Sequence, residues 1–226
     1  DLFISNGYNK EARDNDYLRN YSKKKYFEGD VNYKDGLELM PTTKIHNYIY
    51  RNDGDMHFSK KTEEWNLDIP VNTNGSAYAD LDNDGDLDLI LNNMEETSFI
   101  LENKLQSQNN YIRLRIKGAG DNTAAIGATV KIYAGDQVQF AEVQRSRGYQ
   151  SSVEPFLHFG LGQFDKIDKI EIIWPNGQMM TKQNIAANQI HEFDPSLANG
   201  TYKPDFSTDH HFVENITDSI FNLCLR

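Results

Sequence analysis

The sequence predicts an all-β chain in which a partial β-propeller, carrying one helical insert, is followed by a C-terminal β-sandwich-like domain. Three observations support this prediction: short strand-like runs, turn sequences between them, and one repeated strand pattern. The repeated pattern reads DLFISN at residues 1–6 and DLILNN at residues 88–93. Two copies of one strand indicate repeated units such as propeller blades, each of which is a small antiparallel sheet.

The propeller portion is assigned to residues 1–105. An insert of about residues 10–27 separates the two copies of the strand, and it is polar and charged. Tyr17, Leu18 and Tyr21 fall on roughly one face of this insert, which predicts a surface helix.

Two turn signals follow the insert. Residues 36–43 contain a glycine and Pro41 and are predicted to form a loop. Residues 48–58 place the sequence NDGD between two strand-like runs, and this tight-turn signal predicts a β-hairpin. The short apolar run at residues 87–91 is predicted to be a strand.

The second domain is assigned to residues 106–195, where the pattern changes to strict alternation. Ile112, Leu114 and Ile116 alternate with basic residues, so we expect a half-buried strand with a basic outer face. Similar short strands recur with turns between them, which is typical of a sandwich or barrel. Residues 196–226 are weakly patterned and are predicted to be a tail or the start of a further unit.

Composition disfavours several classes of protein. The formal charge is −11, from 34 acidic and 23 basic residues, and this negative field disfavours nucleic acid as a partner. No run approaches the ~18 apolar residues of a transmembrane helix. The single cysteine, Cys224, allows no internal disulfide and no cysteine-based zinc site. The strand-like start at Asp1 leads us to expect a fragment of a longer protein.

The most distinctive feature is an acidic loop at residues 80–88, which reads DLDNDGDLD. A carboxylate stands at every second position, and Gly85 permits the sharp backbone reversal that brings such side chains together. Calcium takes roughly six to eight oxygen ligands, whereas magnesium retains several waters, so the pattern predicts Ca²⁺. The predicted ligands are Asp80, Asp82, Asp84, Asp86 and Asp88.

Two alternatives compete with this calcium site. An EF-hand requires a bidentate glutamate where Leu91 stands, so that motif is excluded. A solvated acidic turn without metal is disfavoured, because five carboxylates within nine residues repel one another unless a cation neutralises them. The similar turn at residues 52–55 has too few carboxylates and is predicted to be a plain hairpin.

The sequence contains none of the familiar catalytic motifs. It has no nucleophile elbow, no HExxH motif and no phosphate-binding loop. His158 lies between two apolar residues and is expected to be a packed, structural histidine. We therefore expect that the protein is not an enzyme, and an enzyme assembled from scattered carboxylates is the alternative.

A second candidate surface lies near the middle of the second domain. Its polar and aromatic residues are Arg145, Arg147, Tyr149 and Gln150. They could form a contact surface for a protein partner or a glycan. In the alternative interpretation this segment is a structural turn, and Tyr149 and Trp174 pack inside the β-domain.

Two resemblances to known families rest on these motifs. The acidic loop at residues 80–88 resembles the calcium loop of FG-GAP/VCBS repeats in integrin-type β-propellers. Residues 47–55 resemble the preceding hairpin of such a blade, and residues 75–79 resemble the strand that leads into the loop. Further motifs resemble the ASPIC/UnbV domain, in the order of that family: IGA at 126–128, RGYQSS at 147–152, LHFGLG at 157–162, WPNG at 174–177 and ANQ at 187–189. Together the resemblances cover about residues 1–195.

The resemblance implies an exported, calcium-supported scaffold or adhesion module that binds protein partners at the cell surface. The resemblance also implies a role accessory to nutrient uptake at the bacterial outer membrane. The alternative function is a glycan-binding module of a surface polysaccharide-utilisation system.

Overall fold

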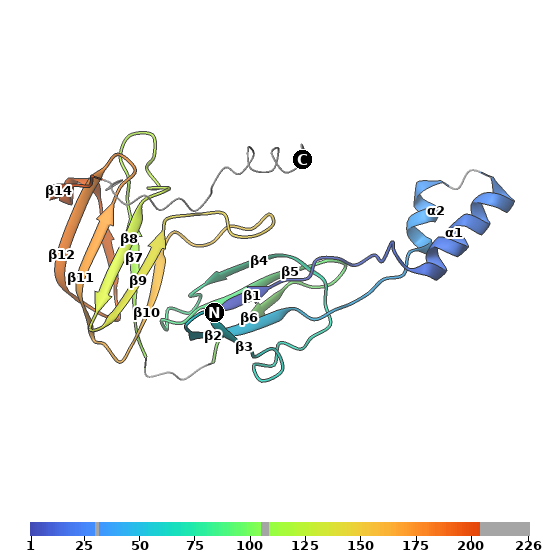
Figure 1. Ribbon diagram of the computed structural model, residues 1–226, viewed down its shortest axis with the longest axis horizontal. Coiled ribbons are helices and arrows are strands. Elements are labelled where there is room, and N and C mark those ends of the chain that lie inside the picture. The colour runs from blue at the N-terminus through green and yellow to red at the C-terminus, as the bar shows by residue number, and fades with distance from the viewer. Residues whose placement is uncertain (30–31, 105–108, 204–226) are drawn as a thin grey trace, which may run out of the picture.

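The computed structural model describes residues 1–29, 32–104 and 109–203, and within them the chain is mostly β-strand. Two β units and a helical arm make up this part of the molecule (Figure 1). The predicted all-β fold is confirmed. None of the described helices is both long and apolar enough to cross a membrane.

The N-terminal unit contains two open antiparallel sheets of three strands each. The first has the order β1-β2-β3 and the second β4-β5-β6, so each resembles a propeller blade rather than a closed barrel. The strands are β1 (Leu2–Ile4), β2 (Tyr48–Gly54), β3 (His57–Lys60), β4 (Thr73–Ala79), β5 (Asp88–Asn93) and β6 (Phe99–Leu101).

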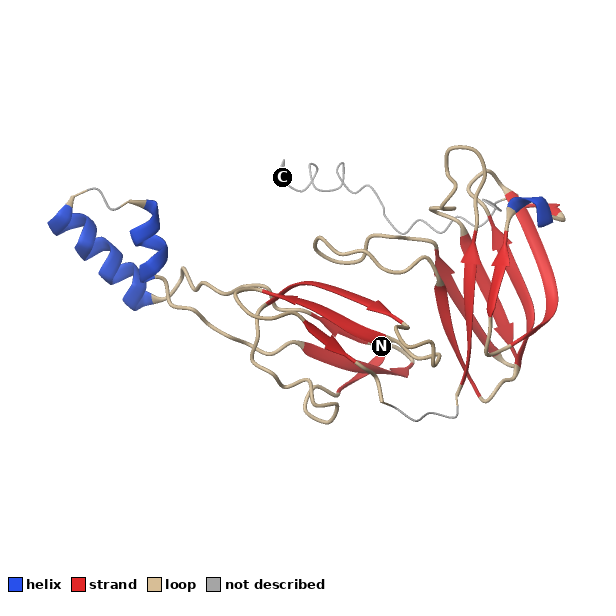
Figure 2. Ribbon diagram, turned by 180° about the vertical axis from the view of Figure 1, so that it is seen from behind, coloured by secondary structure: helices blue, strands red, loops and turns tan. Residues whose placement is uncertain are grey.

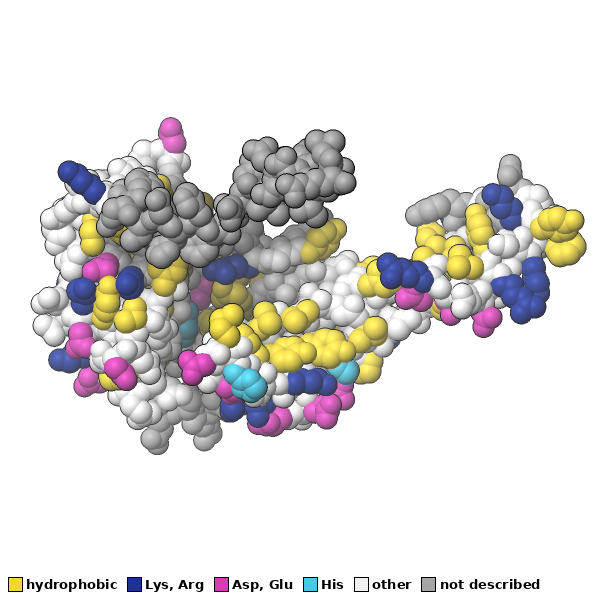
Figure 3. All heavy atoms as spheres, in the orientation of Figure 1, with side chains coloured by type: hydrophobic (Ala, Val, Ile, Leu, Met, Phe, Trp, Pro, Cys, Tyr) yellow, Lys and Arg dark blue, Asp and Glu magenta, His cyan; other side chains and the backbone are white. Residues whose placement is uncertain are grey.

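The open sheets leave apolar side chains uncovered. Figure 3 shows such side chains gathered over the N-terminal unit. Leu2 and Ile4 on β1 are each 45% exposed, and Ile100 on β6 is 71% exposed.

The hairpin predicted at residues 48–58 is confirmed, because β2 pairs with β3 in antiparallel register, with a bulge between Asn52 and Gly54.

The helical arm extends away from the N-terminal unit (Figure 2) and consists of α1 (Asn15–Glu28) and α2 (Tyr33–Leu39). Asp14 caps α1 by accepting a hydrogen bond from the Tyr17 amide at 2.8 Å. Tyr17 is buried, whereas Leu18 is 47% exposed, so the expected apolar face is only partly buried.

The second helix corrects the loop predicted at residues 36–43 over its first part, because α2 ends at Leu39 and only residues 40–43 lie outside it. Asn32 caps α2 by accepting hydrogen bonds from the amides of Lys34 and Asp35. The glycine in the middle of α2 lies close to the Tyr21 ring of α1, where it permits tight packing of the two helices. A cap and this packing therefore outweigh the low helix propensity of glycine.

The C-terminal unit packs two sheets around one apolar core. The sheet orders are β10-β7-β13 and β14-β12-β11-β8-β9. Ile112, Val130, Ile170 and Trp174 belong to this core and are at most 2% exposed. The strands are β7 (Asn110–Ile116), β8 (Thr129–Ala134), β9 (Gln137–Glu142), β10 (Leu157–Gly162), β11 (Lys166–Ile173), β12 (Gln178–Ala186), β13 (Ile190–Phe193) and β14 (Gly200–Thr201).

Part of the predicted tail joins this unit. The turn of 3-10 helix η1 (Pro195–Leu197) leads into β14, which pairs with β12. The rest of that prediction, residues 204–226, lies outside the described residues.

The expected basic outer face of β7 is wrong for one residue. Ile112, Leu114 and Ile116 are buried as predicted, but Arg113 is only 4% exposed. Its guanidinium forms ion pairs with Asp80 at 2.8 Å and Glu154 at 2.6 Å, which compensate the buried charge.

Candidate metal centre

The acidic loop connects β4 to β5 at the end of their hairpin, where Ala79 pairs with Asp88. Asn83 and Gly85 adopt positive φ angles of 64° and 98°, and these residues reverse the backbone. The turns are supported by side-chain hydrogen bonds, since the Asp84 amide donates to Asp82 and the Asp86 amide donates to Asp84.

Three of the predicted ligands come together. One carboxylate oxygen from each of Asp80, Asp82 and Asp84 lies within 4.8 Å of the other two. Asp80 is 6% exposed, and its Oδ1 atom is buried without a hydrogen-bond partner. A buried, unpartnered carboxylate oxygen is costly in the absence of a cation, so this donor set fits a hard metal ion such as Ca²⁺.

Asp86 lies beside this cluster, and its Oδ1 is also buried without a partner. Burial, followed by the charges of Asp84 and Asp88, raises the pKa of Asp86 to about 6. At Asp82, a hydrogen bond from the Asp84 amide lowers the pKa, but desolvation and neighbouring carboxylates outweigh it and raise the pKa overall. The loop therefore concentrates negative charge that a cation would neutralise.

Asp88 has a different environment and is not part of the three-carboxylate cluster. It is 2% exposed, and its two oxygens accept hydrogen bonds from the amides of Leu81 at 3.0 Å and Asn103 at 2.8 Å. These bonds tie the start of the loop to the segment that follows β6.

The acidic loop also contacts the C-terminal unit. Arg113 donates from Nη1 to Asp80 Oδ2, and the same nitrogen lies 3.5 Å from the Asn83 side-chain oxygen. Its Nη2 pairs with Glu154, and its guanidinium lies 4.6 Å from the Phe156 ring centroid. Alternation along β7 identified the face on which Arg113 lies, but no signal in the sequence indicated that the acidic loop covers that face.

His158 lies at the same contact. Its ring stacks on Tyr111 with a centroid distance of 5.7 Å and an interplanar angle of 4°. Burial, and then the positive charge of Arg113, lower the pKa of His158. These contacts agree with the packed, structural role expected for His158.

The second candidate surface is a long loop between β9 and β10 that extends toward the N-terminal unit (Figure 1). Ser151 in this loop accepts a hydrogen bond from the Ser76 amide on β4 at 3.0 Å. Arg147 and Gln150 are exposed, Arg145 is half-buried, and Tyr149 is 66% exposed.

The two aromatic residues that were expected to pack inside the β-domain, Tyr149 and Trp174, have different environments. Trp174 packs inside the β-domain as expected and donates a hydrogen bond to the Lys117 carbonyl at 2.8 Å. The expectation that Tyr149 packs inside is wrong, because its side chain is 66% exposed. With Trp174 only 2% exposed, the pair cannot form a stacking platform for a sugar.

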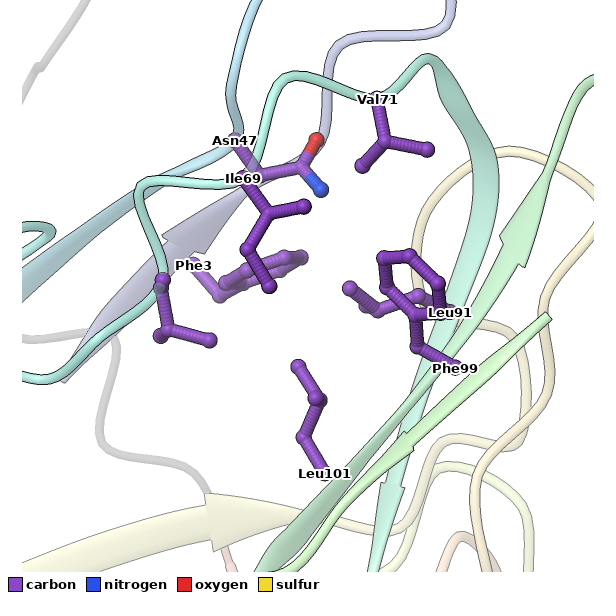
Figure 4. Close-up of a pocket in the computed structure, with 8 residues that line it drawn as sticks. Phe3, Asn47, Ile69, Val71, Leu91, Phe99 and Leu101 are labelled. Atoms are coloured by element: carbon purple, nitrogen blue, oxygen red, sulfur yellow. The ribbon is translucent and has the colours of Figure 1, made fainter. Parts of the chain in front are cut away.

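A pocket in the N-terminal unit offers little chemistry for a ligand (Figure 4). Its only side chain with polar atoms, Asn47, donates to Thr73 and accepts from the Asn6 amide. The apolar side chains that line it are Phe3, Leu67, Ile69, Val71, Leu91, Phe99 and Leu101. This pocket is therefore a packing space between the two sheets.

Two family models match the chain in the order of its two units. The model of an FG-GAP-like repeat matches residues 40–91, which include the whole acidic loop, and the model of ASPIC and UnbV matches residues 118–199. The chain therefore contains an FG-GAP-like repeat followed by an ASPIC/UnbV domain, and the resemblance found in the sequence is confirmed.

Cartilage acidic protein 1 is a curated relative of this chain. The chain is 32% identical over 121 residues to that protein from Xenopus tropicalis and 30% identical over 121 residues to that from Homo sapiens. Each alignment covers 52% of this chain but 18% of the relative. The chain thus spans less than a fifth of the length of the curated relatives it matches.

Proposed function

We propose that the chain is a calcium-stabilised module of an exported protein that binds protein partners and does not act as a catalyst. FG-GAP-like and ASPIC/UnbV domains fit an extracellular, adhesion-type module. The observation that carries the proposal is the buried, unpartnered Oδ1 of Asp80, which lies among the carboxylates of Asp82 and Asp84.

Asp80, Asp82 and Asp84 would hold the ion. Further oxygen ligands from Asp86, from backbone carbonyls or from water would complete a calcium shell of roughly six to eight oxygens. The ion would neutralise the carboxylate charge and hold the loop in shape, so its role is that of a structural clip. An extracellular module of this kind binds calcium with a Kd of about 10⁻⁴–10⁻³ M, which suits a calcium-rich outer compartment.

An extracellular location is supported by the two domain types. This sequence has one cysteine and therefore no internal disulfide. Disulfide-free exported proteins suit bacteria, and we place the protein at the bacterial cell surface.

The apolar side chains exposed over the N-terminal sheets support contact with protein (Figure 3). The glycan-binding alternative is weakened because Trp174 is buried and only Tyr149 of the pair is available for stacking.

Thermal unfolding with and without calcium tests the metal site. A ligand that binds only the folded state adds about 2.7 kcal/mol of stability at a hundredfold excess over its Kd. We expect calcium to raise the melting temperature of the chelator-treated chain and to have no effect on Asp82→Asn. Asp55→Asn is the matched control, because Asp55 lies in the other acidic turn, between β2 and β3, and should leave the calcium response intact.

The proposal is wrong if calcium and chelator leave the melting temperature of the wild-type chain unchanged. It is also wrong if Asp55→Asn removes the calcium response as completely as Asp82→Asn does.

A further inference from the structure

We propose that Arg113 couples calcium binding in the acidic loop to docking of the C-terminal unit against that loop. This inference rests on the proposed calcium site and assigns Arg113 as a positioning residue that acts on the metal through Asp80. The bound ion and the contact between the two units would then stabilise each other.

The two carboxylate oxygens of Asp80 have separate environments. Oδ2 accepts a hydrogen bond from Arg113 at 2.8 Å, whereas Oδ1 is buried without a partner. The Asp80 side chain is 0% exposed, so it cannot exchange Arg113 for water without opening the contact. Arg113 therefore holds the carboxylate in the orientation that leaves Oδ1 free for the ion.

Arg113 is itself held by the C-terminal unit. It lies on β7, pairs with Glu154 at 2.6 Å and packs against the Phe156 ring. Glu154 and Phe156 belong to the long loop before β10, so the guanidinium joins that loop, β7 and the acidic loop at one point. Because the Arg113 side chain is 5% exposed, both carboxylate partners are needed to offset the cost of burying its charge.

Other contacts between the units surround the same point. Gly85 in the acidic loop lies against the Tyr111 ring of β7. The Ser76 amide on β4 donates to Ser151 in the long loop. The acidic loop and the neighbouring strand β4 therefore supply the N-terminal side of this contact.

The expected direction of the coupling follows from these contacts. Without a cation the crowded carboxylates repel, which loosens the loop surface that receives Tyr111 and Arg113. With calcium bound, the loop is held in the shape that fits β7. Coupling of this kind is reciprocal, so any change that weakens docking must also weaken calcium binding.

Calcium titration of the full chain by isothermal calorimetry provides the first test, with calcium alone as the probe. Replacing a residue that orients a metal ligand lowers metal affinity by about tenfold to a hundredfold, and we expect about tenfold for Arg113→Met. Arg115→Met is the matched control. Arg115 lies on the same strand, packs on the same Phe156 ring and pairs with Glu192, but contacts no carboxylate of the acidic loop. We expect its calcium affinity to equal that of the wild-type chain.

Hydrogen exchange of the Ser76 amide, followed by NMR, is the second readout, because this amide reports on the contact between the units. Calcium should slow its exchange in the wild-type chain and in Arg115→Met, but not in Arg113→Met. A residue with a merely structural role would change the exchange rate equally with and without calcium. If Arg113→Met does not fold, Glu154→Gln replaces it and should show the same loss to a smaller extent.

The outcomes separate this inference from the proposed function. If the wild-type chain does not bind calcium, both are wrong. If the wild-type chain binds calcium and Asp82→Asn does not, the calcium site stands. In that case, the coupling alone is overturned if Arg113→Met and Arg115→Met bind calcium with equal affinity and show equal calcium-dependent protection of the Ser76 amide. Where Glu154→Gln replaces Arg113→Met, the same comparison with Arg115→Met applies.

Discussion

Gly85 and Tyr111 lie so close together that a Cβ atom on Gly85 would stand 1.9 Å from the Tyr111 ring. The glycine therefore serves two purposes, because its φ angle of 98° turns the acidic loop and its missing side chain admits a ring from the other unit. The turn of the candidate metal loop is also its contact with the C-terminal unit.

Gly85→Ala is expected to destabilise the chain by more than backbone strain alone. A positive φ angle costs a non-glycine residue about 1–2 kcal/mol, and overpacking against Tyr111 adds about 1–3 kcal/mol. Gly54→Ala is the matched control, because Gly54 has a φ of 89° and a Cβ added there would meet nothing within 4 Å. Urea unfolding measures both free energies, and equal losses in the two variants would show that the Tyr111 contact is unimportant.

Asp88→Asn is expected to destabilise the chain with or without calcium. An asparagine keeps one oxygen acceptor, so one of the two partly buried amides, of Leu81 or of Asn103, loses its hydrogen bond to the charged Asp88 carboxylate, at a cost of about 1.5–3 kcal/mol. Asp82→Asn should instead lose stability only in calcium. Chemical unfolding in chelator distinguishes the two residues, and an unchanged free energy of unfolding in Asp88→Asn would contradict the stabilising role of these two hydrogen bonds.

The acidic loop could be predicted from the sequence because its determinants are local. Alternate carboxylates and a glycine within nine residues define the turn and the donor set without knowledge of the rest of the fold. The separate role of Asp88 could not be predicted in this way, because one of its partners is the amide of Asn103 from beyond β6.

Arg113 shows where prediction from alternation ends. Alternation along β7 correctly placed Ile112 and Leu114 in the core and Arg113 on the opposite face. It does not say what lies on that face, and here the acidic loop and Glu154 cover it. Helix α2 was missed for a related reason, because its packing against Tyr21 of α1 outweighs its local glycine.

The pKa of His158 should lie below 6.5 and should rise when Arg113 is replaced. Burial is the larger cause of the lowered pKa and Arg113 the second, so Arg113→Met should move it only part of the way back. Ring proton shifts in an NMR titration measure this pKa, and Arg115→Met should leave it unchanged. A pKa that does not respond to Arg113→Met would place the two side chains too far apart to interact.

The lowered pKa of His158 also gives the sign of its effect on stability. The unfolded chain binds the proton more tightly than the folded one, so stability from the neutral ring is present above pH 6.5 and is lost as the pH falls below it. Replacement by glutamine, in His158→Gln, should flatten this part of the stability profile in urea unfolding. A slope below pH 6.5 that is identical in both proteins would contradict the prediction.

Asp86 should have the opposite effect in the chelator-treated chain. Its pKa is raised to about 6, so the folded state binds the proton more tightly than the unfolded state, whose pKa is about 3.9. Stability from the protonated group is present below about pH 3.9 and is lost as the pH rises through about 6. Above that pH the carboxylate is ionised, and burial and the charges of Asp84 and Asp88 make this form unfavourable. Asp86→Asn should therefore be more stable than the wild-type chain above about pH 6, with the advantage shrinking as the pH falls to about 4. Urea midpoints across this range measure the advantage, and a difference that does not change with pH would show that charge at Asp86 is not its cause.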